Sequence, residues 1–148
     1  DFCGLGPEIQ PRRGGLNALG TQMLLELRGC DPRLLDDLGY IQDALLSAAV
    51  EMGATVLGHT FHKFSPQGVT GIVAIAESHL SIHTWPEHGY AAVDIFTCGS
   101  VHPDRAAEVI VARLRPREPA VFEMKRGILA AIREHSLVAQ GGEHERGN

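Results

Sequence analysis

The amino-acid sequence predicts an α+β fold, a two-layer α/β sandwich in which helices cover one face of an antiparallel sheet. The first observation is the order of the expected elements, which runs strand, helix, several strands, helix, strand. The second is that short turns at residues 65–68 and 86–89 join successive strands, as in an antiparallel meander. The third is size, because 148 residues of which 44% are hydrophobic suffice for one domain with its own core.

The chain should enter this fold through a strand followed by a helix. Alternating apolar residues predict a strand over residues 22–28. Asp31 is then a candidate N-cap, with Pro32 as the first helical residue. One continuous helix should end before Gly53, because an apolar stripe with helical spacing runs up to that point. The stripe consists of Leu34, Leu38, Ile41, Leu45, Ala48 and Met52.

The later elements are predicted from apolar or alternating runs between turn residues. Strands are expected over residues 54–64, 69–76, 80–84, 91–98 and 120–125. Helices are expected over residues 103–114 and 128–139. Three regions follow from this pattern: a flexible N-terminal arm over residues 1–18, one domain over residues 19–126, and a C-terminal helix and tail over residues 127–148.

Composition excludes several classes of partner. The net charge is −5 and no long Lys/Arg cluster is present, so nucleic acid is not expected as a partner. The longest apolar run, residues 71–76, is far too short to span a bilayer, so no membrane association is expected. Cys3, Cys30 and Cys98 show neither zinc-ribbon nor disulfide-framework spacing, which favours a reducing cytoplasm.

Chemistry is concentrated in residues 77–89, which contain three histidines, two glutamates, two serines and the only tryptophan. In a strand, His79, Ser81 and His83 would share one face. The histidines and Cys98 supply atoms that bind metals, but their spacing matches no zinc signature, so no metal is expected. A Ser/His hydrolase is the other option that the residues leave open, although Ser78 lacks the glycines of a nucleophile elbow.

Two segments, Glu77-Ser-His-Leu-Ser-Ile-His-Thr-Trp-Pro-Glu87 and Ala91-Ala-Val-Asp-Ile-Phe-Thr-Cys-Gly99, closely resemble the self-cleavage and active-site region of the prokaryotic S-adenosylmethionine decarboxylases. The resemblance extends back through Phe61-His-Lys-Phe-Ser-Pro-Gln-Gly-Val-Thr70 and covers about residues 19–126. It implies that the proenzyme cuts itself between Glu77 and Ser78, giving a beta chain, 1–77, and an alpha chain, 78–148. It also implies that Ser78 becomes a pyruvoyl group, the cofactor that forms a Schiff base with substrate.

The resemblance assigns roles to further residues. Cys98 matches the proton donor in decarboxylation, and His83 matches the histidine that accepts a proton during processing. Thr70 stands where bacterial relatives carry a processing serine. Phe64 matches an aromatic that stacks on adenine and Glu87 a carboxylate that holds the ribose hydroxyls, whereas core packing and a solvated turn charge are the respective alternatives.

The chemistry of self-cleavage adds a structural expectation. An amide is more stable than an ester, so a strained Glu77–Ser78 turn, or hydrogen bonds to the developing oxyanion, should assist the reaction. The expected activity is decarboxylation of S-adenosylmethionine for spermidine synthesis, by a dimer of processed protomers. A same-fold decarboxylase of arginine or ornithine is one alternative, because Thr21-Gln22 stands where relatives often carry Arg-His. A non-catalytic regulatory paralogue is the other.

Overall fold

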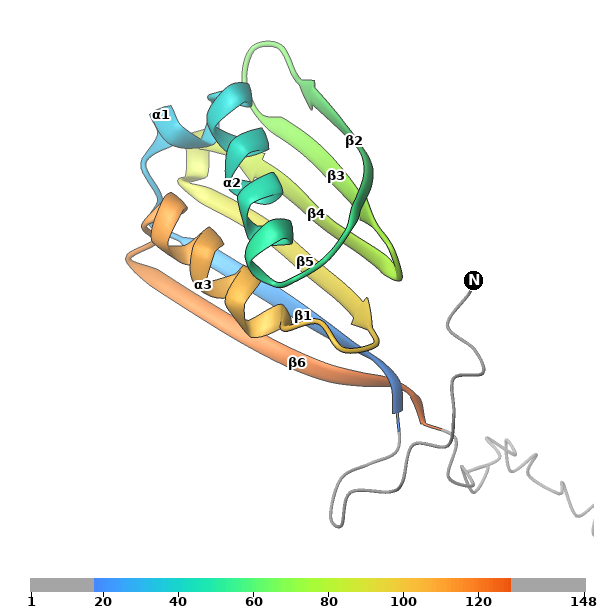
Figure 1. The fold of residues 1–148 in the computed structure, drawn as a ribbon. Coiled ribbons are helices and arrows are strands. Elements are labelled where there is room, and N and C mark those ends of the chain that lie inside the picture. The colour runs from blue at the N-terminus through green and yellow to red at the C-terminus, as the bar shows by residue number, and fades with distance from the viewer. Residues whose placement is uncertain (1–17, 129–148) are drawn as a thin grey trace, which may run out of the picture.

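The structure is a computed structural model, and it describes residues 18–128. Six antiparallel strands form one sheet in the order β2-β3-β4-β5-β1-β6 (Figure 1). The strands are β1 (Ala18–Arg28), β2 (Val56–Lys63), β3 (Val69–Ile75), β4 (Ser78–Trp85), β5 (Tyr90–Cys98) and β6 (Glu118–Ile128). The helices are α1 (Pro32–Leu35), α2 (Leu38–Glu51) and α3 (Pro103–Leu114), and a short 3₁₀ turn, η1, spans Pro86–His88.

Helices α2 and α3 lie across one face of the sheet, which confirms the predicted two-layer α+β sandwich (Figure 1). The core lies between these layers. It is formed by side chains that alternate along the strands, together with the inward faces of the two helices. Its largest fully buried members are Leu25, Leu27, Leu35, Ile41, Leu45, Met52, Leu80, Ile82, Ile95, Ile110, Leu114 and Val69.

Cys30 belongs to this core, with 5% of its surface exposed. Burial raises the pKa of its thiol to about 11, because the thiolate would lose its hydration. The residue therefore serves as a small apolar side chain, as is usual for a buried cysteine.

The prediction of one helix from residue 32 to residue 52 is wrong. The chain forms two helices, because Asp31 caps α1 by accepting from Arg33 N–H, and Asp37 caps α2 by accepting from Tyr40 N–H. The apolar stripe continues across the break because α1 also points Leu35 into the core.

The strands at the sheet end formed by β1 and β6 are longer than predicted. Strand β1 begins at Ala18 and β6 runs over Glu118–Ile128, and the two pair along almost their whole length. Ile128 is therefore in a strand, where the sequence predicted a helix, and residues 129–139 of that helix lie outside the described residues. Helix α3 spans Pro103–Leu114, as predicted.

The sheet face opposite the helices is not covered by any element within residues 18–128, and we call it the open face. Several large apolar side chains lie exposed on it, although the chain's helical layer is well packed. They are Leu24, Ile72, Phe122 and Met124.

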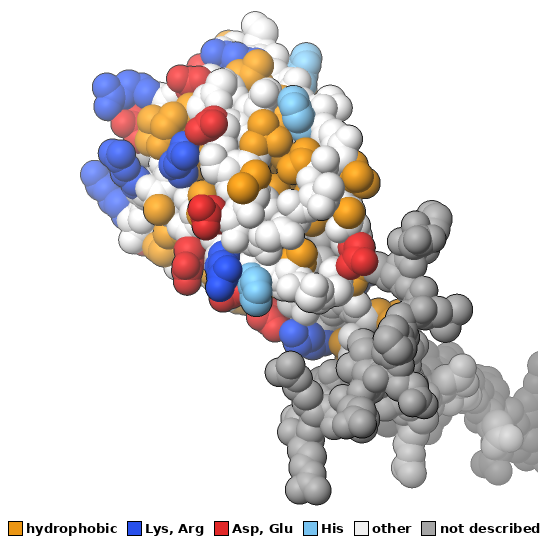
Figure 2. Space-filling view, viewed as in Figure 1, with side chains coloured by type: hydrophobic (Ala, Val, Ile, Leu, Met, Phe, Trp, Pro, Cys, Tyr) orange, Lys and Arg blue, Asp and Glu red, His pale blue; other side chains and the backbone are white. Residues whose placement is uncertain are grey.

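The opposite, helical side is shown in Figure 2, where Lys and Arg side chains gather at the end that holds α1. None of the helices in the described part of the chain is long and apolar enough to cross a membrane.

Candidate active site

The bond predicted to be cut lies in the hairpin between β3 and β4. Strand β3 ends at Ile75, β4 begins at Ser78, and these two residues pair with each other, so only Ala76 and Glu77 form the turn. Glu77 and Ser78 have positive φ angles of 81° and 139°. Neither is glycine, and L residues with a Cβ are disfavoured in this region, so the backbone is strained on both sides of the bond. The strained turn expected from the chemistry is present.

The sulfur of Cys98 lies against this strained bond. Cys98 is the last residue of β5, and its Sγ lies 3.3 Å from the carbonyl oxygen of Glu77. The same Sγ is 3.9 Å from Oγ of Ser78. In this structure Cys98 is part of a disulfide bond, so a proton-donating role requires its reduced form. Sγ of Cys98 thus lies against both Oγ of Ser78 and the carbonyl oxygen of Glu77.

Gly99 makes room for Glu77 at this end of the sheet. The position that a Cβ of Gly99 would take is already filled by the Glu77 carboxylate, and Gly99 also has a positive φ of 86°. The positive φ favours glycine here, whereas the flexible Glu77 side chain could move away from a Cβ.

Thr70 and His83 form a second pair elsewhere on β3 and β4. They are directly opposite each other across the two strands, and Oγ1 of Thr70 lies 2.9 Å from Nδ1 of His83. A hydroxyl that hydrogen-bonds one ring nitrogen orients the imidazole and leaves the other nitrogen, Nε2, available for proton transfer. His83 is exposed on the open face.

The structure does not bring these two pairs together within one chain. His83 is five residues from Ser78 along β4, which is about 16 Å in a strand that rises about 3.3 Å per residue. Thr70 shows the same separation from the hairpin, because it pairs with His83. The described chain thus holds two separate pairs of candidate residues, Ser78 with Cys98 and Thr70 with His83, and each pair is called a half-site below.

A polar cluster on the open face was not predicted from the sequence. The carboxylate of Asp94 contacts Nε2 of His79 at 2.9 Å, Nε2 of Gln22 at 3.3 Å, and the hydroxyl of Ser81. Arg126 extends the cluster by donating to Oε1 of Gln22 at 2.8 Å. One signal was available, because Asp94 is the only charged residue in β5, which is mostly apolar.

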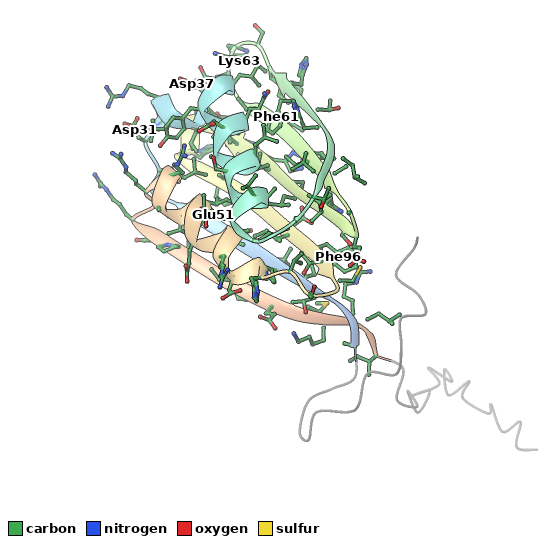
Figure 3. The ribbon with its side chains drawn as sticks, in the orientation of Figure 1. Asp31, Asp37, Glu51, Phe61, Lys63 and Phe96 are labelled. Carbon is green, nitrogen blue, oxygen red and sulfur yellow. The ribbon has the colours of Figure 1, made fainter. Side chains whose placement is uncertain are left out.

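The arginine of this cluster also lies over an aromatic ring. The guanidinium carbon of Arg126 is 5.1 Å from the centroid of Phe96, which Figure 3 labels near the end of β5. Strands β1, β4, β5 and β6 are therefore linked by polar and cation–π contacts beside the Ser78 half-site.

Phe64 and Glu87, the residues matched to substrate binding, both lie at the surface. Phe64 is 48% exposed and forms a T-shaped ring contact with His62 at a centroid distance of 4.6 Å, so the core-packing alternative is wrong. Glu87 is exposed in η1. A solvated turn charge and a ribose ligand are both compatible with that position.

An aromatic pair follows His83 along the open face. Trp85 stacks on Tyr90 with ring centroids 5.3 Å apart, and the Tyr90 hydroxyl donates to Glu26 at 2.6 Å. Burial, and then the hydrogen bond to the Glu26 carboxylate, raise the pKa of Tyr90 to about 12. Tyr90 therefore stays neutral at physiological pH.

Among the described residues, no three His, Cys, Asp or Glu side chains are grouped as metal ligands.

Known proteins resemble this chain along most of its described length. The family model described as S-adenosylmethionine decarboxylase matches residues 21–127. S-adenosylmethionine decarboxylase proenzymes of Thermodesulfovibrio yellowstonii and Caldanaerobacter subterraneus are 49% and 52% identical over 114 residues, which is 76% of this chain and 84% and 92% of theirs. The proenzyme of Pseudomonas aeruginosa is 48% identical over 122 residues, 81% of this chain and 76% of its own.

A solved structure is similar as well. The adenosylmethionine decarboxylase of Aquifex aeolicus superposes with a TM-score of 0.71 at 38% identity, covering 76% of this chain and 94% of its own. With the family model matched along most of the chain and several relatives near 50% identity, the chain belongs to the S-adenosylmethionine decarboxylase family.

Proposed function

We propose that this protein is a self-processing, pyruvoyl-dependent decarboxylase that converts S-adenosylmethionine to S-adenosylmethioninamine for spermidine synthesis. The observation that carries the proposal is the strained Glu77–Ser78 bond, with Oγ of Ser78 and the carbonyl of Glu77 both against Sγ of Cys98. A binding module that only regulates a partner has no use for this arrangement. The proposed compartment is the reducing cytoplasm, where Cys98 would be kept as a thiol.

Self-processing uses only groups of the chain and water. The Ser78 hydroxyl attacks the Glu77 carbonyl carbon, the C–N bond breaks, and an ester replaces the amide. The positive φ angles at both residues raise the energy of the amide form, so less energy is needed to reach the ester. Removal of the Ser78 α-proton breaks the bond between Cβ and the ester oxygen, which releases the backbone carboxylate of Glu77 and leaves a dehydroalanine. The dehydroalanine tautomerises to an imine, water adds to the imine carbon, and the nitrogen leaves as ammonia. A pyruvoyl group remains at residue 78.

The residues around Ser78 fit such a group. The pyruvoyl group, once formed, supplies an electron sink for loss of carbon dioxide from an amino acid. Cys98 would then deliver a proton to the product, because its Sγ is the side-chain atom found against Oγ of Ser78. His83 would move the processing proton, with its ring oriented by the Thr70 hydroxyl.

The two half-sites support a dimer with shared active sites. His83 is about 16 Å from Ser78 along β4, too far for direct proton transfer within one protomer. Both half-sites lie on or beside the open face, whose exposed apolar side chains would be covered by a second copy. We therefore propose that Ser78 and Cys98 of one protomer meet the partner's Thr70 and the partner's His83.

Co-expression of two variants that are each impaired in self-cleavage tests whether the site is shared between protomers. Ser78→Ala cannot cleave, and His83→Ala should cleave slowly. When the two are co-expressed, the His83→Ala chain should regain cleavage, because the Ser78→Ala partner supplies an intact histidine. If each site lies within one protomer, mixing restores nothing. Size-exclusion chromatography with light scattering should give a dimer for the wild-type protein.

The activity itself is tested by mass spectrometry and carbon dioxide release under a reductant. The wild-type protein should appear as two pieces, residues 1–77 and residues 78–148, the second blocked by pyruvoyl. Carbon dioxide should be released from S-adenosylmethionine and not from arginine or ornithine, which are the alternative substrates. Ser78→Ala should remain intact, whereas Ser47→Ala, which removes a hydroxyl on α2, should behave as wild type.

Each contrary result has a defined meaning. A single intact wild-type species would support the non-catalytic paralogue and overturn the enzyme. Release from arginine or ornithine alone would retain the chemistry and correct the substrate. Cys98→Ala should still be cleaved but should lose decarboxylation, and full turnover by this variant would remove Cys98 from the mechanism.

A further inference from the structure

The turn that carries Phe64 is fastened to the end of α1 by one carboxylate. Oδ1 of Asp36 accepts a hydrogen bond from Gly68 N–H at 2.9 Å, and Oδ2 of Asp36 lies 3.4 Å from Nζ of Lys63. Lys63 and Gly68 are the two residues that flank the turn at 64–67. Phe64 N–H closes the turn by donating to the Gly68 carbonyl at 2.8 Å. Both ends of the Phe64 turn are thus held at Asp36.

The neighbouring residue, Leu35, holds the strand that leads to Glu87. Its carbonyl accepts from Oγ1 of Thr84 at 2.8 Å, and the same Oγ1 accepts from Val69 N–H at 2.8 Å. The turn and this strand also touch directly, because a Cβ on Gly68 would lie 3.1 Å from the Thr84 carbonyl oxygen. The segment Leu35–Asp36 therefore contacts both segments that carry the candidate substrate residues.

The backbone of Asp36 is the C-cap of α1, but helix capping does not explain its side chain. Asp31 caps α1 and Asp37 caps α2, whereas the contacts described for the Asp36 side chain are with the Phe64 turn. The hydrogen bond from Gly68 and the nearby Lys63 ammonium lower the pKa of Asp36. Figure 3 labels Lys63 and Asp37 at this end of the molecule, together with Asp31.

We propose that Asp36 is a positioning residue for the nucleoside part of the substrate, acting by holding the turn that presents Phe64. This role rests on the proposed function of Phe64 in S-adenosylmethionine binding. The side chain of Phe64 is half exposed, and the ring contact described for it is with His62. The position of the Phe64 ring therefore depends on the backbone of the turn. Within one chain the Ser78 half-site is at the opposite end of β4, so in the proposed dimer the Phe64 turn would serve the partner's active site. The contacts of Asp36 are with the turn and not with Ser78 or Cys98, so loosening the turn should weaken binding and leave the chemistry intact.

Steady-state kinetics of the processed enzyme test this proposal. Asp36→Ala should raise the KM for S-adenosylmethionine about tenfold, because a charge-assisted hydrogen bond is lost, while kcat stays within about twofold. Asp36→Asn keeps an oxygen for Gly68 N–H and should restore most of the binding. Asp43→Ala is the matched control, because it removes an exposed carboxylate whose partner is Arg113 on α3 and not the Phe64 turn. Its KM should equal the wild-type value.

Hydrogen exchange separates the outcomes. The Gly68 amide should exchange more slowly in wild type than in Asp36→Ala. That difference would show that the hydrogen bond to Asp36 holds the Phe64 turn. An unchanged KM in Asp36→Ala, or a loss confined to kcat, would overturn the positioning role while leaving the decarboxylase intact. A wild-type enzyme that releases no carbon dioxide from S-adenosylmethionine would overturn the proposed function, and the positioning role with it.

Discussion

Replacing Glu77 by glycine should slow self-cleavage because the substitution removes backbone strain. The expected slowing does not come from lost side chains of the site, since Ser78 and Cys98 stay in place. Glu77 has a φ of 81°, which glycine adopts without cost. If that strain helps to drive the amide toward the ester, a relaxed residue should make the reaction harder. The same substitution should make the uncleaved protein more stable toward unfolding.

The size of the effect follows from the backbone. A residue with a Cβ in the left-handed region costs about 1 to 2 kcal/mol relative to the right-handed one. If the whole of this energy is released on reaching the transition state, cleavage of Glu77→Gly should be about 5 to 30 times slower than wild type. Ser78 keeps its own positive φ, so cleavage should not stop.

Cell-free synthesis followed by a denaturing gel time course measures this rate directly. Glu77→Ala is the matched control, because it removes the carboxylate but keeps the Cβ that creates the strain. Its cleavage should stay near the wild-type rate. A glycine variant that is processed as fast as wild type and the alanine control would refute the role of backbone strain.

Three further predictions concern other positions. Gly99→Ala should lower the free energy of unfolding by about 1 to 2 kcal/mol, measured by urea titration, because alanine is strained at a φ of 86° while the flexible Glu77 carboxylate can move aside; an unchanged stability would show that this backbone position tolerates a Cβ. Thr70→Val should slow cleavage about tenfold or more, because it removes the Thr70 hydroxyl that contacts the His83 ring, and Thr70→Ser should be cleaved at the wild-type rate or faster. Equal cleavage rates for the valine and serine variants would exclude a role for this hydroxyl. Cys30, whose pKa is raised from 9.0 to about 11, should favour the folded state below pH 9 and lose that contribution as the pH rises through 11. The free energy of unfolding of the wild-type protein, measured in urea, should therefore fall by up to about 2 to 3 kcal/mol between pH 9 and pH 11. The free energy of unfolding of Cys30→Ala should change less with pH over the same range.

Much of the fold could be predicted because its signals are local. Alternation along β4 indicated that His79, Ser81 and His83 share a face, and the register with β5 confirms this. The break between α1 and α2 was missed, because the apolar stripe is continuous and only the capping contact of Asp37 ends the first helix. The length of β6 was missed for another reason, since its pairing with β1 joins residues about a hundred positions apart.

The candidate site was predictable in its residues and not in its arrangement. The motif indicated Ser78, His83 and Cys98, but their separation into two pairs depends on strand register. The contacts of Asp94 and Asp36 join groups from distant segments, so the lone charge of Asp94 in its strand could mark the residue but not its partners. Phe64 illustrates the limit well, since its exposure, which decides between stacking and packing, appears only in the structure.

The strand order has a consequence for the protein after cleavage. A cut at Glu77–Ser78 assigns β1, β2 and β3 to one piece and β4, β5 and β6 to the other. In the sheet, β1 lies between β5 and β6, so each piece is interleaved with the other. Separation would require three strand interfaces to open at once, namely β3–β4, β5–β1 and β1–β6. The molecule can therefore lose the peptide bond in the β3–β4 hairpin and still unfold as one cooperative unit made of two chains.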